Sequence, residues 1–120
     1  MLKKYALIIA ILYTLVITIL SFISINNVPD LGFEYQDKIA HVLIYFFFTL
    51  VWYFFFQRLQ LSRAVSKSIF LALIYGIVIE VLQGSLTVSR QFDYYDIAAN
   101  IIGALLLVPF LKLNERYVKK

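Results

Sequence analysis

Four long apolar segments, separated by short polar ones, dominate the pattern of this chain. The apolar runs cover residues 5–25, 39–56, 69–86 and 94–111. About 20 apolar residues in a helix cross the hydrocarbon core of a bilayer, which is roughly 30 Å thick. The pattern therefore predicts four transmembrane helices, and the short connections between them predict an antiparallel bundle.

The first run is long for a signal peptide, and the last run is short for a membrane span. A cleaved signal peptide is the alternative for the first run, but its apolar region should be only about 7–15 residues long. We therefore expect this run to be retained as a span. The last run is short unless Tyr94 and Tyr95 extend it as interfacial anchors. Pro109 lies near its far end, where we expect a missing hydrogen bond to do little harm.

Composition supports a membrane protein and limits the chemistry. The chain has 120 residues, of which 62% are hydrophobic and 15% are charged, against about 25% charged residues in an average protein. No room remains for a separate soluble domain, so we expect one membrane domain over residues 1–120. The absence of cysteine excludes disulfide and thiolate chemistry. No Cys/His metal motif is present, and we predict no cofactor.

The charges predict an orientation. If the N-terminus is cytoplasmic, the inner segments carry nine of the eleven Lys and Arg residues, and the outer loops carry only Lys38 and Arg90. This bias follows the positive-inside rule and predicts that both termini are cytoplasmic. The net charge of +4 is therefore a signal of topology. Because these charges are divided among loops, we expect no nucleic-acid partner.

Polar residues recur at helical spacing in three of the four runs. Each set lies on one face of its predicted helix. The sets are Asp37, His41 and Tyr45; Gly76, Glu80 and Gln83; and Asp93, Asp96, Asn100 and Gly103.

The three sets also lie at similar depth. With a rise of about 1.5 Å per residue, His41 lies roughly 6 Å below Asp37, and Asn100 lies roughly 6 Å below Asp96. Glu80 lies roughly 9 Å from the end of its run. Ionisable residues within a membrane face the bundle interior or a wet cavity. We therefore predict that His41, Glu80 and Asn100 share a polar network in the outer leaflet.

The residues near the mouth of this network also have structural interpretations. Asp37 and Asp93 would serve as N-caps of their helices, and the helix dipole would favour Asp96 in the first turn. Arg90 would neutralise the outer acids. These roles require no ligand.

The interior residues have structural alternatives too. Asn100 and Gln83 are residue types that form hydrogen bonds between membrane helices. His41, the only histidine, would be a buried partner of Glu80 or Tyr45. Glu80 fits a structural role least well, because neutral glutamine would form hydrogen bonds without burying a charge.

Three classes of function remain open. The first is a binding site for a lipid head group, an envelope precursor or an amphiphilic antibiotic, and the acidic outer half favours a cationic guest. The second is an enzyme in which Glu80 and His41 form an acid–base pair oriented by Asp96; a metal held by these three residues lacks the usual ligand spacing. The third is a scaffold in which the polar residues only lock the bundle. The candidate binding residues are Asp37, Lys38, His41, Tyr45, Glu80, Gln83, Arg90, Asp93, Asp96 and Asn100.

Three ordered motifs carry a family resemblance. The stretches DKIAHVLIY, EVLQ and SRQFDYYDIAANIIGALL, between Asp37 and Leu106, resemble the VanZ-like family of small bacterial membrane proteins. Leu107 stands where that family usually has a small residue. The resemblance implies a multi-pass protein of the bacterial cytoplasmic membrane with a role at the cell envelope. The family's namesake is associated with resistance to the glycopeptide teicoplanin, so the resemblance adds a glycopeptide to membrane lipids as a candidate partner.

Overall fold

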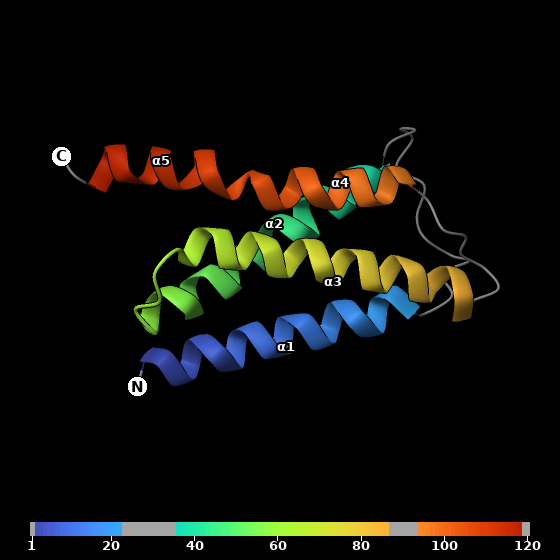
Figure 1. Ribbon diagram of the computed structural model, residues 1–120, viewed down its shortest axis with the longest axis horizontal. Helices are drawn as coiled ribbons and strands as arrows, with labels where there is room; N and C mark the ends of the chain where they lie inside the picture. The colour runs from blue at the N-terminus through green and yellow to red at the C-terminus, as the bar shows by residue number, and fades with distance from the viewer. Residues whose placement is uncertain (1, 23–35, 87–93, 119–120) are drawn as a thin grey trace.

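The computed structural model describes residues 2–22, 36–86 and 94–118, and it describes only the backbone at residues 2, 21–22, 36–37, 83–86, 94 and 114–118. The described chain is helical apart from a turn at residues 59–63 and a break at Leu106 (Figure 1). Its helices are α1 (Leu2–Phe22), α2 (Gln36–Arg58), α3 (Ala64–Leu86), α4 (Tyr94–Leu105) and α5 (Leu107–Val118).

Four stretches are long and apolar enough to cross a membrane. They are Lys3–Leu20, Lys38–Arg58, Ala64–Leu82 and Tyr95–Leu113. The predicted all-helical class is thereby confirmed, and the four predicted runs correspond to helices that are long and apolar enough to cross a membrane. The third helix begins at Ala64, five residues before the predicted run, so the polar residues Ser66 and Lys67 belong to its first turns.

The fourth span differs from its prediction because it is divided in two. α4 ends at Leu105 and α5 begins at Leu107. Proline has no N–H group, so Pro109 cannot donate the helical hydrogen bond to the carbonyl of Leu105. The neighbouring bonds survive, with Leu106 N donating to Ile102 O at 3.0 Å and Phe110 N donating to Leu106 O at 3.2 Å. Pro109 therefore interrupts the span instead of lying harmlessly at its end.

The turn between α2 and α3 has a defined hydrogen-bond pattern. Leu61 N donates to Phe56 O at 3.2 Å, and Gln60 N donates to Gln57 O at 2.9 Å. With Gln60 at a φ of 60°, these bonds form a Schellman motif, in which a left-handed residue ends the helix. Glycine is the usual residue at this position, so Gln60 adopts a conformation that its side chain disfavours.

α2 lies at the centre of the bundle, in contact with α1, α3 and α4. The beginning of α2, the end of α3 and the beginning of α4 lie together at the right of Figure 1, whereas both chain ends lie at the left. We call the right-hand end, where α2 and α4 begin, the polar end, because the sequence-predicted polar residues lie there.

Small and aromatic residues together form the core. Ala72, Ala104 and Phe48 are each at most 1% exposed, and Phe48 stacks on Tyr75 with ring centroids 4.8 Å apart. Small residues allow membrane helices to approach closely, and the close contact gains dispersion energy. Moving an apolar side chain from lipid into the bundle gains little by itself, because lipid tails are equally apolar.

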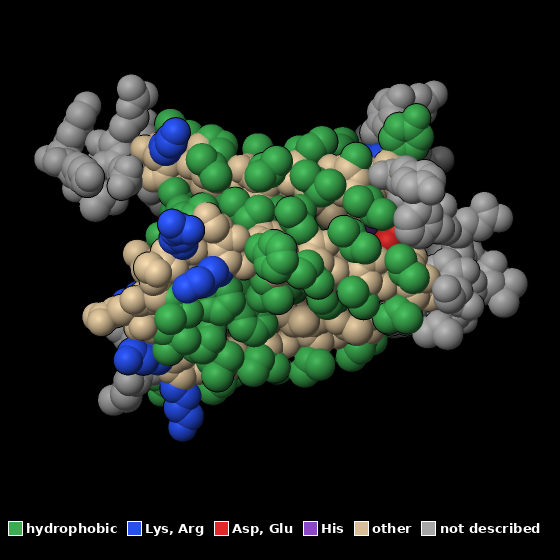
Figure 2. All heavy atoms as spheres, viewed as in Figure 1, with side chains coloured by type: hydrophobic (Ala, Val, Ile, Leu, Met, Phe, Trp, Pro, Cys, Tyr) green, Lys and Arg blue, Asp and Glu red, His purple; other side chains and the backbone are tan. Residues whose placement is uncertain are grey.

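The surface is consistent with a membrane environment. Figure 2 shows a broad apolar belt, with most of the visible Lys and Arg side chains at the left-hand end. The described basic residues at that end are Lys3, Lys4, Arg58, Arg63, Lys67 and Lys112.

Candidate functional site

An ion pair between α2 and α4 lies at the polar end. Lys38 donates a hydrogen bond from Nζ to Asp96 Oδ1, and the two groups form a salt bridge. The Asp96 side chain is only 9% exposed, whereas that of Lys38 is 28% exposed. Asp96 lies in the first turn of α4, where the helix dipole also favours a negative charge. The local fold thus stabilises a carboxylate at this position.

His41 connects Asp96 to the interior. Its Nε2 lies 3.6 Å from Asp96 Oδ1, and its Nδ1 lies 3.2 Å from Asn100 Oδ1. His41 follows Lys38 by three positions on α2, and Asn100 follows Asp96 by four on α4, so each pair lies on one helix face. Both ring nitrogens face oxygen acceptors. The ring therefore bridges two polar residues of α4 from one position on α2.

Two glycines permit the close approach of the helices around this site. A Cβ atom at Gly103 would lie 2.3 Å from the carbonyl oxygen of Val42, so α4 and α2 are in backbone contact there. A Cβ atom at Gly76 would lie 3.0 Å from Asn100 Nδ2 and 3.1 Å from Tyr45 Cε2. Gly76 therefore leaves the space that the Asn100 amide occupies between α3 and α4.

The Asn100 amide has an unsatisfied donor. The residue is 3% exposed, and none of the described residues accepts a hydrogen bond from its Nδ2. A buried donor without an acceptor costs about 1–3 kcal/mol. Such a group is most stable when a bound molecule or an ordered water supplies an oxygen.

Glu80 points into the bundle instead of into lipid. It is 2% exposed and lies one helical turn beyond Gly76 on the buried face of α3. Tyr45, which is 4% exposed, interacts electrostatically with both Glu80 and Asp96. Acidic groups from α3 and α4 thus approach one buried tyrosine of α2.

The remaining predicted residues lie outside the description of side chains. Asp37 and Gln83 fall within α2 and α3, but only their backbone is described. Arg90 and Asp93 lie outside the described residues. Their proposed roles stay predictions.

The metal alternative finds no geometric support. No group of three His, Cys, Asp or Glu side chains in the described part of the chain is arranged to hold a metal ion. His41, Glu80 and Asp96 all belong to that part, so they do not form the metal site considered from the sequence. Their arrangement is better suited to hydrogen bonding and to pairing with charged groups.

A second polar network, which was not predicted from the sequence, joins α1 to its neighbours. Trp52 Nε1 donates to Thr14 Oγ1 at 3.0 Å, Tyr13 OH donates to the carbonyl of Ile44 at 2.6 Å, and the hydroxyls of Thr18 and Tyr75 share a hydrogen bond. Thr14 and Thr18 are spaced i, i+4 in an otherwise apolar helix. That spacing was the available signal for this interface.

Fold and site together define a four-span helical membrane protein with a buried polar cluster at one end. No protein-family model matches the chain. Over 93 residues, or 77% of the chain, it is 37% identical to a protein of Schizosaccharomyces pombe described as "Uncharacterized protein C11E3.10". The aligned stretch covers 54% of that protein, so the chain spans about half the length of this relative. No solved structure matches the chain.

Proposed function

We propose that the polar end binds an envelope amphiphile whose head group carries both an ammonium group and an oxygen acceptor. The unsatisfied amide nitrogen of buried Asn100 is the observation that carries this proposal. A phosphate or carbonyl oxygen would accept its hydrogen bond. The buried Glu80 carboxylate would attract the ammonium group. A lipid, an envelope precursor and an amphiphilic antibiotic all fall within this class.

We further propose that the helices form an antiparallel bundle with both termini in the cytoplasm. The segregation of basic residues to the end opposite the polar cluster supports this orientation. The polar end then faces the outer leaflet, where envelope amphiphiles are exposed.

Membership of the VanZ-like family is part of the proposal, and the three ordered motifs support it. This assignment places the chain in a bacterial cytoplasmic membrane and gives it a contribution to glycopeptide resistance of the teicoplanin type. The yeast relative indicates that similar sequences also occur outside bacteria. A direct binding measurement is therefore a better first test than a bacterial phenotype.

The decisive variant is Glu80→Gln, which removes the charge and keeps the size and hydrogen-bonding capacity. Thermal unfolding of the purified chain in detergent would be measured with and without added phosphatidylethanolamine. A ligand that binds only the folded state raises the midpoint of unfolding with concentration. We expect wild type to be stabilised, and the variant to keep its unliganded midpoint but lose this response.

Two controls complete the experiment. Glu115→Gln makes the same substitution in α5, near the opposite end of the bundle, and should respond as wild type does. Phosphatidylglycerol lacks an ammonium group and should stabilise wild type less. A Glu80→Gln variant that responds fully to phosphatidylethanolamine would rule out recognition of the ammonium group by this carboxylate.

A scaffold role is the second candidate, and the bonds between α2 and α4 favour it. Lys38 with Asp96, and His41 with Asn100, hold these helices together without any ligand. If this is their whole purpose, wild type and the Glu80→Gln variant should both be insensitive to every lipid head group. Teicoplanin susceptibility of cells that express each variant would then also be unchanged.

A further inference from the structure

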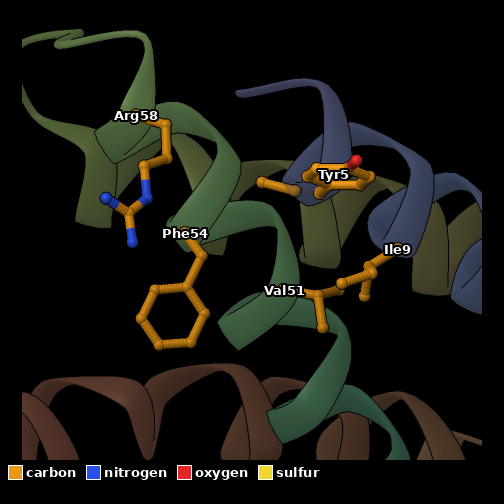
Figure 3. A pocket seen from close by; sticks show the side chains of 6 residues that line it. Tyr5, Ile9, Val51, Phe54 and Arg58 are labelled. Atoms are coloured by element: carbon orange, nitrogen blue, oxygen red, sulfur yellow. The ribbon is translucent and has the colours of Figure 1, made fainter. Parts of the chain in front are cut away.

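A groove between α1 and α2 lies far from the polar cluster, at the end where α1 begins. Its volume is about 210 Å³, and its lining residues are Tyr5, Ala6, Ile9, Val51, Phe54 and Arg58. In Figure 3, Tyr5 and Ile9 form the α1 side, and Val51, Phe54 and Arg58 form the α2 side. The groove is smaller than the roughly 300–1,000 Å³ typical of sites that enclose a drug-sized ligand. Its size suits part of a ligand, such as a length of acyl chain, instead of a whole drug-sized molecule.

The lining residues of this groove change from apolar to polar along α2, as the parts of a phospholipid do. Arg58 is seven residues beyond Val51 on α2, so the two lie roughly 10 Å apart along the helix axis. Apolar side chains line the deeper part, while Tyr5 and Arg58 lie near the helix ends. Tyrosine and arginine at such positions are typical of the membrane–water interface.

Charge identifies the class of lipid. Glu80 and Asp96, the two acids whose side chains are described, belong to the opposite end of the bundle. Arg58 therefore has no described acid beside it, and Lys3 and Lys4 lie in the first turn of α1 near the same end. Basic groups between helices at the cytoplasmic side bind anionic lipid head groups. A planar guanidinium also pairs well with phosphate oxygens.

We propose that this groove binds one phospholipid of the inner leaflet with an anionic head group. Its phosphate pairs with Arg58, and one acyl chain lies against Ile9, Val51 and Phe54. Its assignment to the inner leaflet rests on the proposed orientation, but the site itself is separate from the amphiphile site at the polar end.

The test is native mass spectrometry of the purified full chain with equal amounts of phosphatidylglycerol and phosphatidylcholine. Wild type should retain phosphatidylglycerol preferentially. Arg58→Gln should reduce this retention about fivefold, which corresponds to the ~1 kcal/mol expected for one basic residue near anionic lipid. Lys67→Gln removes an exposed basic residue at the same end, on α3 and outside the groove, and should retain the lipid as wild type does.

A second pair of variants tests the groove itself. Ala6→Phe fills the space between the helices and should reduce retention of both lipids, whereas Ala98→Phe adds the same bulk on an exposed face of α4 and should not. Equal losses in Arg58→Gln and Lys67→Gln would show a diffuse charge effect and overturn the proposal. A wild-type dimer that is separated by Ala6→Phe would instead assign the groove to a second copy of the chain. Should Ala6→Phe fail to fold, the comparison of Arg58→Gln with Lys67→Gln decides the question.

Discussion

Two of the interfaces that α2 makes, with α4 and with α1, hold their helices by different means. Against α4 the backbones touch at Gly103, and the contact is joined by an ion pair and a histidine–amide bond. Against α1 the contact depends on hydrogen bonds from aromatic side chains, such as Trp52 to Thr14. α1 also exposes nine large hydrophobic residues between Tyr5 and Leu20.

This difference shows how helices associate when lipid is as apolar as their own side chains. Burying an apolar face gains little there, so close packing of small residues and bonds between polar groups must hold the helices together. The α2–α4 interface has both features and positions the candidate site. α1 depends mainly on the second, with Ala10 as a fully buried small residue, and its exposed outer face is suited to lipid contact. We therefore expect substitutions at the first interface to have larger effects than those at the second.

The largest effect is expected from Gly103→Ala. Its new methyl group would collide with the backbone of Val42, which cannot move without separating α2 from α4. We expect a loss of at least about 1–3 kcal/mol in the free energy of unfolding, the usual range for overpacking. Gly76→Ala is the matched control, because its methyl group meets side-chain atoms of Asn100 and Tyr45 that can shift. Denaturant titration in detergent should rank the two variants in this order, and equal losses would contradict the backbone-contact explanation.

An intermediate effect is expected from the ion pair. Lys38→Met leaves the buried Asp96 carboxylate without its lysine, whereas Asp96→Asn removes the charge that is more deeply buried. Breaking a fully buried pair costs about 3–5 kcal/mol. Because Lys38 is partly exposed and His41 stays near Asp96, we expect roughly 2 kcal/mol for Lys38→Met, on the same scale. Asp96→Asn should lower the free energy of unfolding by less. A double-mutant cycle would measure the coupling energy between Lys38 and Asp96. The reverse order would show that Asp96 is stable without Lys38.

The smallest effect is expected at the α1 interface. Thr14→Val removes the acceptor for Trp52 and should cost about 0.6 kcal/mol, the average for a hydrogen bond between membrane helices. Thr49→Val is the control, since among the described residues the Thr49 hydroxyl donates to the Tyr45 carbonyl of its own helix and joins no second helix. A loss in Thr14→Val as large as that in Gly103→Ala would overturn the distinction between the two interfaces.

The fold was largely predictable from the sequence. The two mistakes in the predicted helix bounds have identifiable causes. Four runs of about 20 apolar residues admit few structures other than spanning helices, because lipid leaves no partner for exposed backbone groups. The break before Pro109 was misjudged because the apolar run was expected to end at Leu111, whereas the helix continues to Val118 and leaves the proline inside it. The early start of α3 was missed because Ser66 and Lys67 interrupt the apolar pattern without interrupting the helix.

The sequence by itself determined that four helices of this chain are long and apolar enough to cross a membrane and which helix faces are polar, since both follow from periodicity and length. Only the tertiary structure decided that Lys38 pairs with Asp96, that His41 bonds to Asn100, and that Gly103 touches the backbone of α2. Those contacts join residues about 60 positions apart. They depend on the rotation and distance of each helix against its neighbour, which periodicity within a single helix does not specify.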